Sequence, residues 1–133
     1  MKKIEHIGIA VKDLNTSNEL FASLFGEAHY KIEEVETEGV KTSFFKSGPN
    51  KIELLEATNP DSPIAKFIEK RGEGIHHIAY NVDHVNNSLA EAGKKEIRLI
   101  DEKSRKGAEG FDIGFLHPKS TFGVLTEFCG HND

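Results

Sequence analysis

The sequence predicts an α+β domain in which two βαβββ modules follow one another and form a curved mixed sheet around a cleft. Three observations lead to this fold class. The chain has the length of one ordinary domain, a segment near its start recurs in its second half, and each copy alternates between strand-like and helix-like apolar spacing. With 133 residues, we expect one domain that spans residues 1–133.

The repeat is clearest where each half begins. The segment HIGIAV that starts at His6 aligns with HIAYNV, which starts at His77, 71 residues later. Toward the end of each half, Glu53 and Glu127 match in the same way, each within an apolar segment. The two halves are therefore expected to be copies of one structural unit.

Each module has the same expected order of elements. In the first module, about residues 1–71, these are a strand over 4–11, a helix over about 13–25, strands over 30–36, 40–46 and 51–57, and a short helix that begins at Ser62-Pro63. In the second, about residues 72–133, they are a strand over 75–82, a helix over 84–93, strands near 97–101 and 111–116, and a last strand over 123–129. Neither module should fold alone, because about 65 residues bury only a marginal core.

Composition excludes several classes of function. The chain has 17 basic and 22 acidic residues, and the formal charge of −5 argues against nucleic acid as a partner, although a local basic patch can still bind an anion. Cys129 is the only cysteine, so no internal disulfide can form, which suits a reducing cytoplasm. The apolar run at the N-terminus is too short and polar for a signal peptide or a membrane span. We therefore expect a soluble cytoplasmic protein with no membrane partner.

Four polar residues occupy strand positions that should be apolar. His6 and His77 lie on the face opposite the Ile and Val side chains of their strands, and Glu53 and Glu127 lie near the middle of apolar last strands. A carboxylate there is costly unless it is paired or bound to a metal. Because a pseudo-twofold repeat brings equivalent positions together, we expect one mixed N/O site that suits Zn²⁺, Fe²⁺, Co²⁺, Mn²⁺ or Ni²⁺.

A simpler interpretation exists for each of these residues. A single strand histidine is usually structural or exposed, a strand glutamate usually faces solvent, and duplication alone can preserve a pattern without a metal. Recurrence of both residue types at matching positions favours the shared site. For other residues we expect ordinary roles: His76 points to the face opposite His77, and Cys129, Phe111 and Phe122 pack in the core.

Several longer segments point to a known family. They are HIGIAV at 6–11, ELLE at 53–56, SPIAKF at 62–67, GIHHIA at 74–79, FLHPKS at 115–120 and GVLTE at 123–127. Together they resemble the methylmalonyl-CoA epimerases of the vicinal oxygen chelate superfamily, which also contains glyoxalase I and the extradiol dioxygenases. The resemblance covers nearly the whole chain.

The resemblance implies interconversion of (2R)- and (2S)-methylmalonyl-CoA through an enolate, as in propionate metabolism. It places the metal ligands at His6, Glu53, His77 and Glu127, the same four residues that the repeat singles out. It also implies an acyl-CoA substrate and a homodimer, and among the candidate cations we expect Co²⁺.

The acid and base groups are harder to assign. Some relatives carry a glutamate at the position matching Thr42 and a glutamine at the position matching Glu53, and this chain departs from them at both. We hypothesise that an oxygen of Glu127 serves one face of the substrate, and that Glu53 or a water serves the other. For the CoA phosphates, Lys103, Arg105 and Lys106 lie in a Gly-flanked loop and Lys119 follows a Pro turn, although a solvated charged loop is an equally valid interpretation.

Other functions on this fold are carried as alternatives. A lyase of the glyoxalase I type would share the metal but act on a glutathione hemithioacetal. An extradiol dioxygenase would usually have a longer chain and three ligands. A non-catalytic small-molecule-binding protein would have the cleft but lack the four-ligand set.

Overall fold

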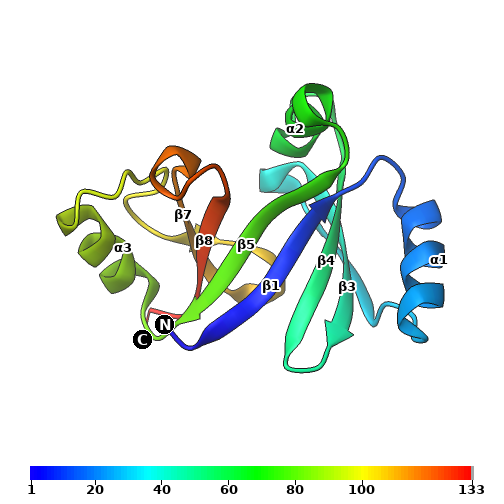
Figure 1. The fold of residues 1–133 in the computed structure, drawn as a ribbon, viewed down its shortest axis with the longest axis horizontal. Coiled ribbons are helices and arrows are strands. Elements are labelled where there is room, and N and C mark those ends of the chain that lie inside the picture. The colour runs from blue at the N-terminus through cyan, green and yellow to red at the C-terminus, as the bar shows by residue number, and fades with distance from the viewer. Residues whose placement is uncertain (133) are drawn as a thin grey trace. The chain divides into compact units, whose positions relative to one another are not determined.

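The computed structural model describes residues 1–132 as two compact units (Figure 1). One unit, called here the first-module unit, is His6–His76. The other, the second-module unit, contains Met1–Glu5 together with the described chain from His77 onward. Both units have the predicted βαβββ order, and the predicted α+β class is confirmed.

The elements of the first module follow the sequence prediction closely. They are β1 (Lys3–Ala10), α1 (Leu14–Phe25), β2 (Lys31–Val35), a 3₁₀ turn (Glu36–Glu38), β3 (Val40–Ser47), β4 (Asn50–Ala57) and α2 (Pro63–Arg71). Gly26 ends α1 in the left-handed conformation, φ 75°, and donates its backbone N–H to the carbonyl of Ala22. Ser62 caps α2 by accepting the N–H of Ile64 at 3.1 Å.

The second module departs from the prediction at one strand. Its elements are β5 (Gly74–Val82), α3 (Val85–Lys94), β6 (Arg105–Lys106), a 3₁₀ turn (Ala108–Gly110), β7 (Asp112–Leu116), a 3₁₀ turn (Pro118–Ser120) and β8 (Leu125–Gly130). The strand expected over residues 97–101 is wrong: that segment makes only an isolated bridge from Leu99 to Leu116. The short β6 is the strand that pairs with β7 instead.

A side chain explains why the 97–101 segment is no strand. The N–H of Phe115 on β7 donates to the carboxylate of Asp101 at 2.9 Å, where a neighbouring strand would offer a backbone carbonyl. The carbonyl of Phe115 accepts the N–H groups of Ile100 and Asp101. Both backbone groups of Phe115 are therefore satisfied without a regular ladder.

The two sheets have the same internal order. In the first-module unit the strands lie in the order β2-β3-β4-β1, and in the second-module unit β6-β7-β8-β5. In each, the first strand of the module is parallel to the last, and the remaining pairs are antiparallel. Each module thus forms a small mixed sheet with its last strand in an interior position.

Helices cover defined faces of these sheets (Figure 1). Under α1, Leu54 of β4 packs with Phe45, whereas the adjacent Leu55 packs on the other face with Ile64 of α2. In the second-module unit, Phe128 of β8 packs against α3, so its neighbours Glu127 and Cys129 point to the opposite face. No helix within residues 1–132 is long and apolar enough to span a membrane.

Candidate metal centre

In the first-module unit, His6 and Glu53 lie side by side. The parallel register pairs Gly8 of β1 with Glu53 of β4, which puts His6 and Glu53 on the same face of the sheet. The Nδ1 atom of His6 is 3.1 Å from Oε2 of Glu53, and each side chain is only 7% exposed. The first sequence-predicted histidine therefore lies next to the glutamate of its own module.

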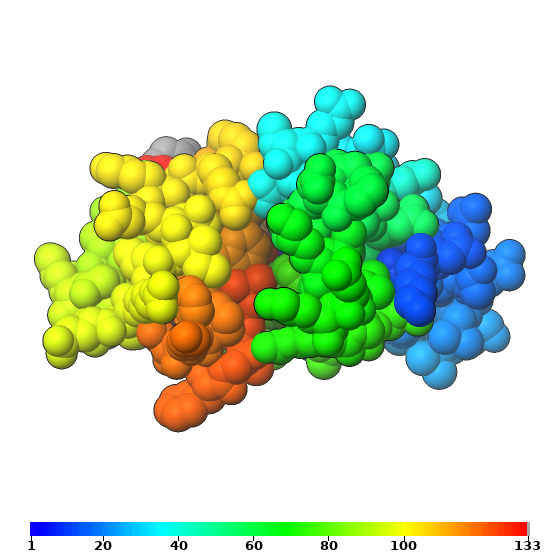
Figure 2. All heavy atoms as spheres, turned by 90° about the horizontal axis from the view of Figure 1, so that it is seen from above, coloured from blue at the N-terminus to red at the C-terminus, as the bar shows by residue number. Residues whose placement is uncertain are grey.

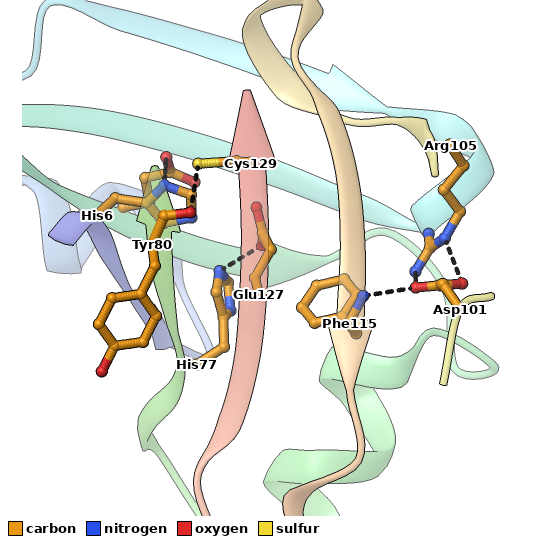
Figure 3. A network of polar contacts seen from close by, with 9 residues as sticks. His6, His77, Tyr80, Asp101, Arg105, Phe115, Glu127 and Cys129 are labelled. Atoms are coloured by element: carbon orange, nitrogen blue, oxygen red, sulfur yellow. Dashed lines mark hydrogen bonds and ion pairs between the residues drawn. The ribbon is translucent and has the colours of Figure 1, made fainter. Parts of the chain in front are cut away.

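The second-module unit contains the equivalent pair. Ala79 of β5 pairs with Glu127 of β8, and His77 shares their face. The Nε2 atom of His77 is 3.2 Å from Oε1 of Glu127, with side-chain exposures of 7% and 5% (Figure 3). The arrangement matches that of His6 and Glu53, except that the ring presents the other nitrogen to its glutamate.

The chemistry of these donors fits a divalent transition metal. Each unit provides one imidazole nitrogen and one carboxylate oxygen, both nearly removed from solvent. Burying a carboxylate is expensive, and a single imidazole neighbour offsets that cost only in part. Nitrogen and oxygen donors in equal number are the ligand set that Zn²⁺, Co²⁺, Mn²⁺, Ni²⁺ and Fe²⁺ accept.

The strand next to Glu53 carries Thr42, which the sequence analysis connected with acid–base chemistry. In the antiparallel register Glu53 is opposite Phe44 and Leu55 is opposite Thr42, so Thr42 and Glu53 are diagonal neighbours on one face. Thr42 is 2% exposed. A hydroxyl at this position cannot act as a base at neutral pH, which leaves Glu53 as the carboxylate on this part of the sheet.

Two residues near Glu127 were missed from the sequence. Phe115 of β7 is directly opposite Glu127, and its ring meets the ring of His77 edge-on, with 5.8 Å between the ring centroids. Asp101 holds the backbone of Phe115. A signal for Phe115 was present, because it lies 71 residues after Phe44, the same offset as between the two histidines.

The basic residues predicted to contact CoA fall into two groups. Arg105 makes an ion pair with Asp101, and Lys106 makes one with Asp112 at 2.8 Å. The hydrogen bond from Lys106 is the main reason that the pKa of Asp112 is lowered. For Lys103 and Lys119 the structure of residues 1–132 gives no ion pair.

Positive charge gathers beside Lys119. The backbone N–H of Arg98 donates to Ser120 Oγ, and the N–H of His117 donates to the carbonyl of Arg98, which brings the two segments together. Figure 2 shows these segments, yellow and orange, adjoining on the surface of the second-module unit. Desolvation first, and then the cations Arg98 and Lys119, lower the pKa of His117.

The remaining sequence expectations have mixed outcomes. Cys129 is buried and its thiol donates to the carbonyl of Tyr80 at 3.7 Å, as expected for a packing residue. Phe111 packs against the buried cluster around Cys129, also as expected. Core packing is wrong for Phe122, which is 99% exposed in a turn with φ 59°. His76 lies against Phe67 of α2, and burial lowers its pKa to about 4.

Comparison with known proteins places these features in context. Residues 5–115 match the family described as the glyoxalase/bleomycin resistance protein/dioxygenase superfamily. The human mitochondrial methylmalonyl-CoA epimerase is 36% identical over 126 residues, which are 94% of this chain and 72% of the human protein. The ethylmalonyl-CoA/methylmalonyl-CoA epimerase of Cereibacter sphaeroides is 35% identical, with 94% of this chain and 95% of that protein covered. A variant of Streptomyces coelicolor methylmalonyl-CoA epimerase, in complex with 2-nitronate-propionyl-CoA, superposes with a TM-score of 0.94 at 36% identity, over 98% of this chain and 95% of the other.

Proposed function

Because the chain belongs to the glyoxalase/bleomycin resistance protein/dioxygenase superfamily and, within it, to the methylmalonyl-CoA epimerases, we propose that it interconverts (2R)- and (2S)-methylmalonyl-CoA at one divalent metal ion. We assign the metal to His6, Glu53, His77 and Glu127. The observation that carries this assignment is the pair of buried His–Glu contacts, one at the same place in each module.

The substrate sets the chemical requirement. Its α-carbon lies between a thioester and a carboxylate, and that carbon must lose a proton on one face and regain one on the other, with an enolate between the two steps. When bound, a divalent cation supplies Lewis-acid stabilisation of the charge that develops on the thioester oxygen. Proton transfer on two faces needs two groups, with the carbon between them.

We assign Glu127 to one face and Glu53 to the other, with a water in place of Glu53 as the alternative. Both carboxylates are buried, so neither is surrounded by bulk water that would compete for the proton. Each belongs to a different module, which suits two groups that approach one carbon from opposite sides. Thr42, the neighbour of Glu53, has no group that can accept this proton.

The CoA part of the substrate needs cationic partners. Lys119 is exposed and lies in the positive region with Arg98 and His117, so we assign it, together with Lys103, to the phosphates. Arg105 and Lys106 each have an acidic partner within the second-module unit, which makes them weaker candidates for this role.

Further properties complete the proposed function. We propose Co²⁺ as the native ion, because a site with two nitrogen and two carboxylate donors and open positions accepts it, and Zn²⁺, Mn²⁺, Ni²⁺ or Fe²⁺ as substitutes. We also propose a homodimer that acts in the cytoplasm in propionate metabolism, as the family resemblance implies.

Deuterium wash-in tests the proposed function. Methylmalonyl-CoA is incubated with the metal-loaded protein in heavy water, and the α-proton is followed by NMR. We expect exchange together with inversion. No exchange, but turnover of a glutathione hemithioacetal, would identify a glyoxalase I-type lyase. A protein with no bound or restorable divalent metal would instead be a small-molecule-binding protein.

A further inference from the structure

A line of contacts connects the surface of the second-module unit to Glu127 (Figure 3). The guanidinium of Arg105 faces the carboxylate of Asp101, with Nε 3.2 Å from Oδ1 and Nη2 3.4 Å from Oδ2. The same guanidinium lies over the ring of Phe115, 5.4 Å from its centroid. That ring meets His77 edge-on at an interplanar angle of 85°, and His77 in turn faces Glu127.

The backbone places these side chains on one face. The antiparallel register pairs Arg105 with Ile113, and Phe115 lies two residues after Ile113, so Arg105 and Phe115 share a face of the sheet. Phe115 directs both of its backbone groups to the 100–101 segment, so its pairing with Glu127 on the other side carries no ladder hydrogen bonds. Side chains in such a pair approach most closely, which brings Phe115 against Glu127 and His77.

The first-module unit repeats the pattern with different residues. Glu53 is opposite Phe44, just as Glu127 is opposite Phe115. The ammonium group of Lys31 lies over the ring of Phe44 at 5.2 Å from its centroid, where Arg105 lies over Phe115. An aromatic ring opposite each buried glutamate, with a cation above it, is therefore a feature of the module and not an accident of one loop.

We infer that Asp101, Arg105 and Phe115 are positioning residues, which hold the ring of His77 in the orientation that presents Nε2 to Glu127. An imidazole can rotate about its bond to Cβ and offer either nitrogen, and groups around the ring decide which one a ligand meets. The edge of Phe115 restricts that rotation. Arg105 fixes Phe115 from above through cation–π contact, and Asp101 fixes both of them.

This inference gives β6 a purpose. The strand has only two residues, too few to add much to the sheet, but its pairing with β7 sets the position of Arg105 over Phe115. It also assigns Arg105 differently from a CoA contact. A lysine could replace an arginine as a phosphate partner, but it could not keep the two-point contact with Asp101 and the flat contact with the ring.

The metal part of the inference rests on the proposed function, so the test has one measurement that is independent of it. Three variants of the full chain are compared with the wild type: Phe115→Leu, Arg105→Lys, and Lys106→Gln as the matched control. Lys106 is also on β6 and also has an acidic partner, Asp112, but it does not contact Phe115.

The independent measurement is the NMR spectrum of the histidine rings in the metal-free protein, with His77 identified by the signal lost in His77→Gln. We expect one narrow set of His77 ring signals in the wild type and in Lys106→Gln. In Phe115→Leu and Arg105→Lys we expect those signals to broaden or to split, because the ring is no longer held in one orientation. Unchanged signals in both variants would overturn the inference.

Two further measurements use Co²⁺ and substrate. Removing the ring should weaken Co²⁺ binding by about 10–100-fold, as for other groups that orient a metal ligand, with a smaller loss in Arg105→Lys. The kcat should fall in both variants, while KM changes by less than about two-fold. A raised KM in Arg105→Lys, with normal ring signals and Co²⁺ affinity, would mean that Arg105 binds substrate. If the wild type neither binds Co²⁺ nor exchanges the α-proton, the proposed function fails, and the ring spectrum still decides the inference.

Discussion

Replacing Glu53 and Glu127 separately by glutamine tests whether the two carboxylates serve opposite faces of the reacting carbon. Glutamine keeps the length and shape of the side chain and an oxygen that can accept a hydrogen bond, but it cannot take up a proton at neutral pH. Each variant of a two-base enzyme therefore retains one working base. That base can remove a proton, exchange it with solvent and return it to the same face.

The expected pattern is specific to each enantiomer. Glu53→Gln should incorporate deuterium into one enantiomer of methylmalonyl-CoA without inverting it, and Glu127→Gln should do the same with the other enantiomer. Epimerisation should fall by about 10²–10⁴-fold in either variant, the usual contribution of a positioned acid or base. At about 1.4 kcal/mol for each factor of ten, this is roughly 3–5 kcal/mol of transition-state stabilisation.

The structure indicates a second, smaller effect that must be separated from the first. Glu53 is 3.1 Å from Nδ1 of His6 and Glu127 is 3.2 Å from Nε2 of His77, so each substitution also removes the charge from a buried contact. Metal content is therefore measured for each variant, and exchange is compared at saturating metal. Glu33→Gln, on the exposed side of β2, controls for the chemical change alone.

The assay incubates each pure enantiomer in heavy water and follows deuterium by NMR and configuration by chiral analysis. Full epimerisation by Glu53→Gln at the rate of the control would show that a water serves the second face. Normal deuterium incorporation into both enantiomers by Glu127→Gln would refute its role as a base. Loss of exchange from both enantiomers in one variant, at normal metal content, would refute the division of faces.

Three further predictions concern stability and the metal. Chelation should abolish exchange, a divalent cation should restore it, and at 100 times its Kd the cation should raise the free energy of unfolding by about 2.7 kcal/mol in chemical denaturation. Gly130→Ala would place a Cβ 2.3 Å from the carbonyl oxygen of Val82, so we expect a loss of about 1–3 kcal/mol in urea unfolding, and an unchanged midpoint would contradict the structure there. His76 has its pKa lowered by burial from 6.5 to about 4, so the unfolded chain binds a proton in this range that the folded chain does not. The metal-free protein should therefore lose about 3 kcal/mol of stability as pH falls from 6.5 to 4, and His76→Phe should remove this dependence in unfolding curves recorded at several pH values.

Repetition made much of the fold and the candidate ligands predictable from the sequence. A histidine or glutamate at one strand position says little, because packing and surface roles are common. The same residue types at matching positions of two modules carry more information, and the structure places His6 beside Glu53 and His77 beside Glu127. Local signals were also reliable where the chemistry is local, as at Ser62, which caps α2, and at Gly26, which ends α1.

The errors arose where distant segments decide the structure. Residues 97–101 have strand-like apolar spacing, but Asp101 meets the backbone of Phe115 with its carboxylate, and no local pattern indicates that substitution. Phe122 was expected in the core on composition alone. It follows a 3₁₀ turn and takes a positive φ, which directs its ring to solvent despite its apolar character.

The aromatic residues opposite the glutamates show where repetition reaches its limit as a guide. Phe44 and Phe115 match as exactly as the two histidines do, yet phenylalanine is the expected occupant of any core strand, and the chain has 9 of them. A match between expected residues adds no information until the register puts each one opposite a buried glutamate. The cations above the rings, Lys31 and Arg105, would not be aligned from sequence at all, because β2 and β6 differ in length and neighbours. Duplication therefore reveals the groups that act on the substrate, because those residues are unusual in a core, whereas the groups that hold them in place become visible only through strand pairing.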